Sequence, residues 1–260
     1  MKKQHDWDPD HYLKFFGERT QPSIDLVSKI KIDYAPRRIL DVGCGPGNSS
    51  QVLLQRWPKA GLVGVDNSPA MIEKAKKDFP KGKWVLADAR RFAPATCFDL
   101  VFSNAAIQWI PGHERLLAKF DCLLSPRGVL AVQTPMFNVM PLGRIIQSVS
   151  LGKRWKKATA GCSRLYHYHD TGYYYDLLAF RMRKIDMWVT DYIHAMPSHL
   201  AIVDWIRSTA LKPYLERIAD AKDRKDFEKE ILREIKKCYP KQKNGNVLYP
   251  FKRLFFIGYK

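Results

Sequence analysis

Three closely spaced glycines mark the segment best suited to bind a cofactor, and they are Gly43, Gly45 and Gly47. Glycine tolerates positive φ and has no Cβ, so a loop with this spacing can turn sharply and approach a ligand through its backbone. The loop follows a short apolar strand predicted at residues 39–42, and we expect Asn48 and Ser49 to cap the next helix. A strand, a glycine turn and a helix N-terminus form the opening of a nucleotide-type cofactor site.

The spacing of these glycines excludes two common phosphate-binding fingerprints. A dinucleotide fingerprint needs a third glycine three places after the second, and Asn48 occupies that position. The Gly-Lys-Ser or Gly-Lys-Thr sequence that cradles phosphates is also absent from the chain.

Acidic residues end the next two predicted strands, 61–66 and 83–88. Asp66 lies 19 residues after Gly47 (66 − 47), and a carboxylate there can accept hydrogen bonds from both hydroxyls of a ribose. Asp88 is placed to meet the amino group of an adenine. Because ligands of open α/β sheets bind at the carboxyl ends of the strands, this pattern predicts an α/β fold with an adenosyl cofactor.

The remaining elements follow from hydrophobic patterning. Ser68 and Pro69 begin a helix. Further strands are predicted at 98–104, 128–133, 184–192 and 254–257, with helices from Ser198 and over roughly 214–238. The stretch 135–175 is expected to be irregular because prolines and glycines interrupt it, and such an enlarged segment is a natural lid over a substrate.

Composition limits the class of protein and its partners. The chain has 260 residues and a formal net charge of +18, of which residues 1–135 carry +6 (20 − 14) and residues 136–260 carry +12 (24 − 12). The electrostatic field of a strongly positive chain attracts anions. Acids and bases alternate over 216–239, however, and this pattern also fits a solvated helix. No apolar run approaches the roughly 18 residues needed to cross a bilayer. Five scattered cysteines and no leader predict the reducing cytoplasm, without disulfides or a zinc site. We also expect a monomer.

Three groups in the second half have chemistry that the sequence leaves open. The run Tyr166-His-Tyr-His169 contains a histidine pair that fits a metal or a base, and equally a surface cluster. His194 follows the strand predicted at 184–192, where a substrate is expected. Arg144 and Arg164 have the side chains to clamp a carboxylate, or lie on a basic surface.

Several longer blocks resemble one known family, the bacterial trans-aconitate 2-methyltransferases. The resemblance begins at Trp7-Asp-Pro with Tyr12 and at Glu18-Arg-Thr, and Asp41–Ser49 resembles motif I of methyltransferases that bind S-adenosylmethionine. The other blocks extend over nearly the whole length and are Arg56-Trp-Pro58, Ser103–Trp109 with His113, His194–Trp205, Lys212–Leu215 and Arg253-Leu-Phe. The Glu-Arg-Thr, Asn-Ala-Ala-x-Gln-Trp and Met-Pro-Ser-His blocks are more specific than motif I.

The resemblance implies a fold, a cofactor and a set of site residues. The fold is α/β, a Rossmann-like seven-stranded class I methyltransferase sheet with helices on both faces and an α-helical substrate cap. The cofactor is S-adenosyl-L-methionine, which becomes S-adenosyl-L-homocysteine. Residues expected to bind it are Arg19, Asp41, Gly43, Gly45, Gly47, Asn48, Asp66, Asn67, Ser68, Met71, Asp88, Ala89 and Asn104. Gln108 and Trp109 are implied beside the transferred methyl, and Tyr12 and Arg19 are implied to close over the cofactor and the substrate. His194 is expected near the substrate from its position. No metal is expected.

We expect these residues to belong to three regions of a single domain. Residues 1–36 form a helical arm that covers the cofactor, residues 37–135 form the cofactor-binding core, and residues 136–260 supply the substrate cap and the last two strands.

The chain departs from the family after the fifth predicted strand. The family usually has Pro-Asp-Asn, then Glu-Pro-x-His and an Arg-Glu pair, whereas this chain has Pro135-Met-Phe, then Met140-Pro-x-Gly and Gln147-Ser. If this segment forms the substrate wall, a tricarboxylate loses polar partners there. The reaction class is therefore better defined by the sequence than the acceptor is.

A carboxylate acceptor is already ionised near neutral pH and needs no general base, which suits a site rich in Tyr, Trp and Arg. A phenol or amine acceptor needs a base, and the candidates are His113, His169 and His194. The leading hypothesis is O-methylation of a carboxylate of a small organic acid. The alternatives are methylation of a malonyl carrier protein, a non-catalytic cofactor-binding regulator, and nucleic-acid methylation or binding. The last is disfavoured because Asn104-Ala-Ala-Ile lacks the prolines and the aromatic residue that hold a flipped base.

Overall fold

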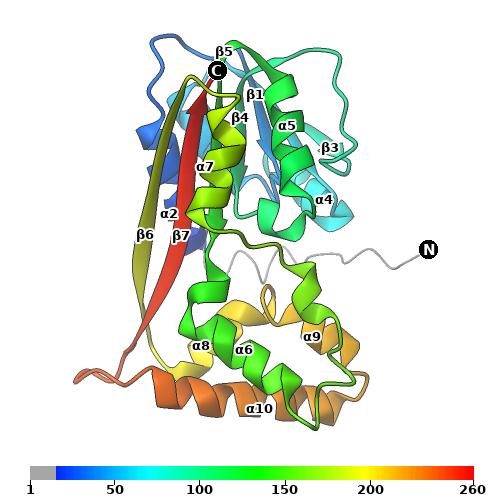
Figure 1. Ribbon diagram of the computed structural model, residues 1–260, viewed down its shortest axis with the longest axis vertical. Coiled ribbons are helices and arrows are strands. Elements are labelled where there is room, and N and C mark those ends of the chain that lie inside the picture. The colour runs from blue at the N-terminus through cyan, green and yellow to red at the C-terminus, as the bar shows by residue number, and fades with distance from the viewer. Residues whose placement is uncertain (1–15) are drawn as a thin grey trace. The chain divides into compact units, whose positions relative to one another are not determined.

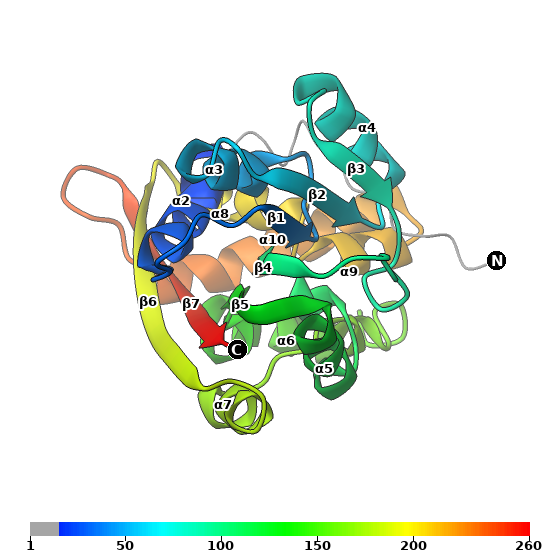
Figure 2. The ribbon, with the colours of Figure 1, turned by 90° about the horizontal axis from the view of Figure 1, so that it is seen from above.

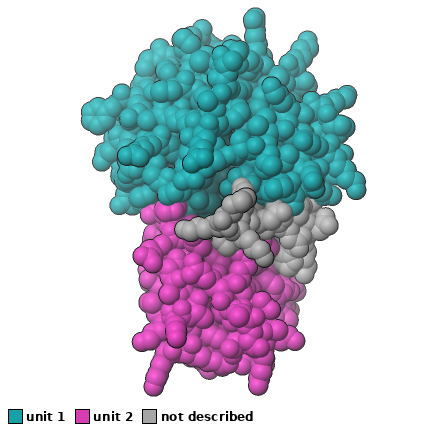
Figure 3. All heavy atoms as spheres, turned by 90° about the vertical axis from the view of Figure 1, so that its right-hand side faces the viewer, with its two compact units in different colours: residues 1–134, 169–189, 254–260 teal, residues 135–168, 190–253 magenta. Residues whose placement is uncertain are grey.

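The structure is a computed structural model that describes residues 16–260 of the chain. The chain forms two compact units, drawn in separate colours in Figure 3. Within the described residues, the first unit comprises 16–134, 169–189 and 254–260, and the second comprises 135–168 and 190–253.

A seven-stranded sheet in the order β3-β2-β1-β4-β5-β7-β6 organises the fold (Figure 1). Its strands are β1 (Arg38–Val42), β2 (Gly61–Asp66), β3 (Lys83–Leu86), β4 (Phe98–Asn104), β5 (Leu124–Pro135), β6 (Lys184–Met196) and β7 (Val247–Tyr259). Strands β1 to β5 pair in parallel. Strand β7 runs antiparallel to β5, because the Lys260 amide donates to the Gly128 carbonyl while the Met136 amide donates to the Lys252 carbonyl. The expected seven-stranded α/β sheet is confirmed.

Helices cover both faces of the sheet in the first unit. They are α2 (Phe16–Lys29), α3 (Asn48–Arg56), α4 (Pro69–Asp78), α5 (His113–Leu123) and α7 (Thr171–Ala179), with a short 3-10 turn η1 at Ile107–Trp109. Figure 2 shows α2 and α3 on one side of the parallel strands and α5 and α7 on the other. The carboxyl ends of β1, β2 and β4 therefore carry the loops that lead into α3, α4 and η1, where the sequence predicts the cofactor site.

The two helix starts predicted in the cofactor-binding core differ in outcome: the one at Ser68 is confirmed and the one at Asn48 and Ser49 is wrong. Ser68 caps α4, and its hydroxyl accepts a hydrogen bond from the Met71 amide. Helix α3 instead begins after Gly47, whose φ is 99°, and no side chain caps it. Asn48 and Ser49 lie inside the first turn, where Asn48 donates to the Thr20 hydroxyl of α2. These side chains join α3 to α2 because α2 offers them polar partners that a local pattern cannot reveal.

The stretch expected to be irregular contains regular elements. In the second unit these are η2 (Phe137–Val139), α6 (Pro141–Leu151) and η3 (Cys162–Leu165), and α7 of the first unit follows them. Pro141 opens α6 at a position where its missing N–H costs nothing. The buried face of α6 consists of Leu142, Ile145, Ile146, Val149 and Ser150. Pro141 and Gly152 therefore mark the two ends of α6, while Gly143 lies in its first turn without preventing the helix.

The long helix expected over 214–238 is two helices. Helix α9 (Lys212–Arg217) ends before Ile218, and α10 (Ala221–Cys238) begins at Asp220, whose carboxylate accepts from the Lys222 and Asp223 amides. The helix expected from Ser198 is confirmed as α8 (His199–Arg207). Both β6 and β7 are longer than predicted and contribute residues to both units.

Two further expectations concern membranes and disulfides. Among the residues that the structure describes, no helix is long and apolar enough to cross a membrane. All five cysteines are free thiols, as expected for a chain without a disulfide framework.

Candidate active site

The glycine loop lies at the carboxyl end of β1 and is fixed to β2. Gly43, Gly45 and Gly47 all have positive φ, at 70°, 54° and 99°. The amides of Gly43 and Cys44 both donate to the Val65 carbonyl, at 2.7 and 3.1 Å. A Cβ on Gly43 would lie 2.1 Å from the Cβ of Ala106, whereas a Cβ on Gly45 would meet no heavy atom within 4 Å. The loop is therefore packed closely at Gly43 and borders open space at Gly45, as a ligand-binding loop requires.

Asp66 connects the glycine loop to the start of α4. One carboxylate oxygen accepts from the Gly45 amide and the other from the Ser68 amide, both at 2.9 Å. A carboxylate has about four acceptor sites, so these two contacts are compatible with ribose hydroxyls as further donors. The structure thus gives Asp66 a role that sequence analysis missed, because it holds the loop in place before any ligand binds.

Two buried polar groups beside the loop fit a polar ligand. Asp41 is fully buried, and the Ser50 hydroxyl donates to one of its oxygens at 2.6 Å. Asn104 donates to the Ser49 hydroxyl at 3.3 Å. The other carboxylate oxygen of Asp41 and the amide oxygen of Asn104 have no hydrogen-bond partner among the described residues. Buried polar atoms rarely remain unsatisfied in proteins, so this arrangement fits a cofactor that supplies donors.

Burial also determines the charge of Asp41. The pKa of Asp41 is raised to about 7, mainly by removal from water; the hydrogen bond from Ser50 lowers it and the nearby Asp66 carboxylate raises it. Asp41 is therefore partly protonated at neutral pH, which sequence analysis does not indicate.

The acid predicted to end the third strand lies beyond it. Strand β3 ends at Leu86, and Asp88 follows in a turn where the Arg90 guanidinium donates to both its oxygens at 2.6 to 3.1 Å. These bonds hold the pKa of Asp88 below its usual range. Ala89 is half-buried beside it, and Asn67, after β2, is exposed. A contact between Asp88 and an adenine remains a prediction.

The loop after β4 brings Gln108 and Trp109 to the same end of the sheet. Ala105 has a φ of 52°, unusual for a residue with a Cβ, and its amide donates to the Gln133 carbonyl of β5. Gln108 is buried and donates to the Ala105 carbonyl at 2.7 Å, while its own amide oxygen has no partner among residues 16–260. Trp109 is half-buried. The backbone strain at Ala105 thus fixes a turn that ends in two candidate site residues.

His113 positions this turn and is not available as a base. Its Nε2 lies 2.9 Å from the Ile107 carbonyl, and its Nδ1 lies 2.8 Å from the Tyr174 hydroxyl. A carbonyl only accepts, so Nε2 carries the proton and the Tyr174 hydroxyl donates to Nδ1. Burial raises the pKa of Tyr174, which keeps its phenol protonated as a donor. The candidate base His113 therefore has both nitrogens occupied.

The histidine pair at 166–169 forms no metal site in the structure. His169 stacks on Tyr173 with the ring centres 3.8 Å apart and lies edge-on to His113 at 5.0 Å. No group of three or more metal-binding side chains occurs among the described residues. His169 therefore packs against the aromatic cluster of α5 and α7.

The other predicted site residues lie in different places. Arg19 of α2 is buried in the first unit, as is Met71 of α4, whereas Tyr12 lies outside the described residues. Arg144 and Arg164, the candidate carboxylate clamp, are both exposed in the second unit.

In the second unit, His194 lies within β6 and not after it. Its ring is 4.9 Å from the Trp205 ring of α8 and 6.3 Å from the Tyr249 ring of β7. Phe137, at a position where this chain departs from the family pattern, is also buried here, and its ring is 6.5 Å from Phe251. A Cβ on Gly143 would lie 2.1 Å from the Phe137 carbonyl oxygen. The departures at Phe137 and Gly143 therefore serve internal packing of this unit.

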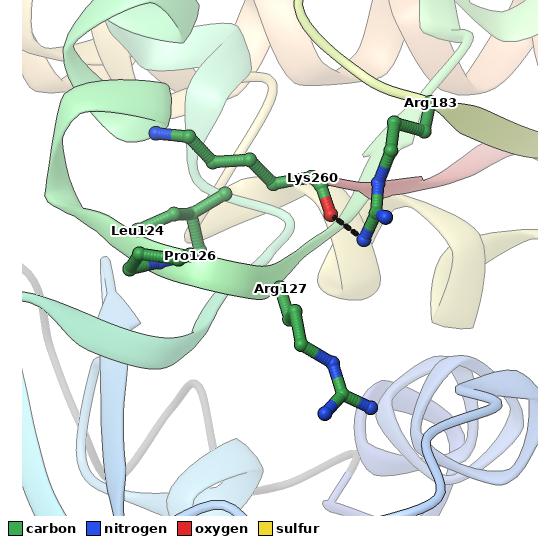
Figure 4. A pocket seen from close by; sticks show the side chains of 5 residues that line it. All are labelled: Leu124, Pro126, Arg127, Arg183 and Lys260. Atoms are coloured by element: carbon green, nitrogen blue, oxygen red, sulfur yellow. Dashed lines mark hydrogen bonds between the residues drawn. The ribbon is translucent and has the colours of Figure 1, made fainter.

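A separate pocket opens at the opposite end of the sheet. It lies where β5 begins and β7 ends, and Figure 4 shows its lining residues: Leu124, Pro126, Arg127, Arg183 and Lys260. Arg183 donates to the Lys260 carbonyl at 2.5 Å. Ligands of open α/β sheets bind at the carboxyl ends of the parallel strands, so this pocket is distinct from the candidate active site.

Comparison with known proteins identifies the family. Residues 39–128 match the family model described as a methyltransferase domain. The trans-aconitate 2-methyltransferase of Escherichia coli K12 strain DH10B is 38% identical over 253 residues, which cover 97% of this chain and 98% of that protein. The enzyme of that name from E. coli O157:H7 is also 38% identical, over 260 residues. The chain belongs to the trans-aconitate 2-methyltransferase family.

Two solved structures of low sequence identity share the fold of this chain. The YcgJ protein of Bacillus subtilis aligns with a TM-score of 0.60 and 14% identity, covering 92% of this chain and 98% of that one. Phosphoethanolamine N-methyltransferase 2 of Haemonchus contortus, solved with S-adenosyl-L-methionine, aligns with a TM-score of 0.59 and 16% identity, covering 96% and 56%. These likenesses show the class I methyltransferase fold. Family and fold together make the chain an S-adenosylmethionine-dependent methyltransferase.

Proposed function

We propose that the chain methylates a carboxylate oxygen of a small polycarboxylic acid such as trans-aconitate. The observation that carries this proposal is the 38% identity, over 97% of the chain, to enzymes named for that acceptor. The identity extends through the second unit, where acceptor-binding residues are expected, and is not confined to the methyltransferase domain at 39–128.

The first unit supplies the residues proposed to hold the cofactor. The glycine loop approaches it through backbone amides, Asp66 receives the ribose hydroxyls, and Asp88 and Ala89 border the adenine. Asp41 and Asn104 lie near the carboxyl ends of β1 and β4, and their oxygens without a partner among the described residues suit the donor groups of S-adenosylmethionine. Further residues proposed around it are Arg19, Asn48, Asn67, Ser68 and Met71.

S-adenosylmethionine, when bound, supplies an electrophilic methyl group on a sulfonium. The chain's own residues need to align the acceptor oxygen and to exclude water, because a carboxylate is already ionised and needs no base. Gln108 and Trp109, fixed by the Ala105 turn and by His113, are proposed to line this position together with Tyr12. The occupied nitrogens of His113 support an acceptor that needs no proton removed.

We propose that the chain acts in the cytoplasm, since its five free thiols suit a reducing compartment. A carrier-protein acceptor is one alternative, favoured by the basic second half of the chain and by the apolar segment after β5. Phe137 and Met140 of that segment are buried within the second unit. Their side chains therefore pack inside this unit and do not form a wall that binds an acyl group.

The direct test compares acceptors. Purified enzyme is given labelled S-adenosylmethionine with either trans-aconitate or malonyl carrier protein at identical salt, and label in a base-labile ester is counted. The proposal predicts turnover of trans-aconitate. Turnover of the carrier protein alone would contradict it, as would label in a base-stable product.

A further inference from the structure

Three buried polar side chains connect helix α2 to the carboxyl end of β4 within the first unit. The Ser23 hydroxyl of α2 lies 2.6 Å from the Ser49 hydroxyl of α3, and the Asn104 side chain of β4 donates to the same Ser49 hydroxyl at 3.3 Å. All three residues are buried. Figure 2 shows α2 and α3 on the same side of the parallel strands, so this Ser23–Ser49–Asn104 network joins α2 to the sheet through the first turn of α3.

The direction of the hydrogen bonds in this network follows from the protons that each group has. A serine hydroxyl donates once and accepts up to twice, whereas the NH2 group of asparagine only donates. Ser49 therefore accepts from Asn104, and its own proton needs an acceptor elsewhere. If Ser23 donated to Ser49, that proton would be left without a partner at a buried position, which is costly. The network is satisfied when Ser49 donates to the Ser23 oxygen.

This direction determines which end of the Asn104 amide is offered to a ligand. Ser49 holds the NH2 group, while the amide oxygen has no partner among residues 16–260. Without the Ser23 oxygen, the Ser49 hydroxyl would donate to the amide oxygen of Asn104, and the amide group would turn over. Its NH2 group would then take the place of the oxygen. Ser23 thus decides whether Asn104 offers an acceptor or a donor.

The place of Asn104 in the sheet indicates which part of the cofactor meets its oxygen. In the strand order β3-β2-β1-β4, Asp88 follows β3 and Asp66 ends β2, whereas Asn104 ends β4 on the other side of β1. The adenine and ribose are proposed beside the two aspartates, so the amino-acid part of S-adenosylmethionine is expected toward β1 and β4. Asp41 of β1 has the other partnerless oxygen there, among the described residues. An ammonium group has three N–H donors and suits both acceptors.

We propose that Ser23 is a positioning residue for the cofactor, which acts through Ser49 to present the Asn104 amide oxygen to the ammonium group of S-adenosylmethionine. This inference rests on the proposed place of the cofactor and deepens it, and it does not depend on which acid is methylated. Sequence analysis singled out Arg19 in α2 and missed Ser23, because a single serine inside a helix carries no local signal.

A second serine of the same helix provides a matched control. Ser28 is exposed, and its hydroxyl donates to the Asp25 carbonyl at 2.8 Å, within α2. Replacing Ser23 or Ser28 by alanine removes one hydroxyl from α2 in each case. The Ser28 hydroxyl has no part in the network, so Ser28→Ala should bind the cofactor as wild type does.

The test compares two ligands that differ at the ammonium group. S-adenosylhomocysteine is titrated by calorimetry, and 5′-methylthioadenosine, which keeps the nucleoside and lacks the ammonium group, is measured by displacement of labelled S-adenosylhomocysteine. We expect Ser23→Ala to weaken S-adenosylhomocysteine binding roughly tenfold, because presenting the Asn104 oxygen then leaves the Ser49 proton without an acceptor. Methylthioadenosine binding should change less than about twofold. Ser23→Cys fills the same space with a weak acceptor and should show a loss of the same kind.

A double-mutant cycle with Asn104→Ala tests the connection between the two residues. Once the amide is absent, Ser23→Ala should have no further effect on S-adenosylhomocysteine binding. The melting temperature without cofactor reports whether each variant folds. The inference is overturned if Ser23→Ala and Ser28→Ala bind S-adenosylhomocysteine equally well, if Ser23→Ala weakens the binding of both ligands alike, or if the effects of Ser23→Ala and Asn104→Ala add.

The outcome for the acceptor is separate. If wild type binds S-adenosylhomocysteine and Ser23→Ala shows the selective loss, but no polycarboxylic acid is methylated, the proposed acceptor fails while the inference about Ser23 stands. If Asn104→Ala binds S-adenosylhomocysteine as wild type does, the proposed contact of Asn104 with the cofactor fails, and the inference fails with it.

Discussion

The buried carboxyl of Asp41 should make the protein less stable as the pH rises from about 4 to about 7. Its pKa is 3.8 in an unfolded reference and about 7 in the folded state, mainly because of burial. Between these values the folded protein holds a proton that the unfolded chain has released, so unfolding releases a proton and becomes easier at higher pH. Asp41→Asn removes this titration and leaves a side chain of nearly the same shape.

The expected magnitude follows from the two pKa values. The interval from 3.8 to about 7 corresponds to about 4 kcal/mol, at 1.36 kcal/mol for each pKa unit. The free energy of unfolding of Asp41→Asn relative to wild type should therefore rise by up to this amount between pH 4 and pH 8. Any constant cost of placing an amide at this position cancels in the comparison between the two pH values.

Urea unfolding followed by circular dichroism between pH 4 and pH 8, without cofactor, measures this difference. Ser50→Ala provides a companion variant, because loss of the hydroxyl that donates to Asp41 should raise its pKa further. The loss of stability should then extend to higher pH. Parallel stability curves for wild type and Asp41→Asn would refute the reasoning.

Three further variants test other parts of the site. Asp66→Asn should weaken S-adenosylmethionine binding, measured by calorimetry, at least about tenfold, because an NH2 group replaces one of the two oxygens that accept from the Gly45 and Ser68 amides. An unchanged dissociation constant would exclude the ribose contact. Tyr174→Phe should cost roughly 1–3 kcal/mol of unfolding free energy and lower kcat, since it leaves Nδ1 of the buried His113 without its donor. Tyr173→Phe, which loses only a bond to the exposed Glu114, should change kcat far less, and equal effects would contradict the positioning role. Gly43→Ala should abolish cofactor binding and lower the melting temperature, because its Cβ would lie 2.1 Å from that of Ala106; normal binding would show that the loop moves.

Much of the cofactor half follows from local sequence patterns. Strand β1, the positive-φ glycines and the Ser68 cap each depend on residues a few positions apart, and the structure has all of them. The order of strands follows the family resemblance. Local pattern is reliable here because a parallel strand, its turn and its helix are short consecutive segments.

The parts that sequence analysis missed depend on distant contacts. Asn48 turns toward Thr20 of α2, and His113 meets Tyr174, 61 residues further along the chain. The helix α6 was missed because Pro141 and Gly143 suggested breaks, yet Pro141 opens the helix and Gly143 allows the Phe137 carbonyl to approach. Asp220 divides the predicted long helix by capping its second part, which charge patterning alone does not reveal.

The central claim is that this chain transfers a methyl group to a carboxylate oxygen of a small polycarboxylic acid. The most direct measurement is nuclear magnetic resonance of the product formed from trans-aconitate and S-adenosylmethionine with an isotope-labelled methyl group. The account predicts one new labelled resonance of an O-methyl ester, which disappears after mild alkaline hydrolysis. A labelled methyl on carbon, nitrogen or sulfur, or no new resonance while calorimetry shows that the cofactor binds, would contradict it.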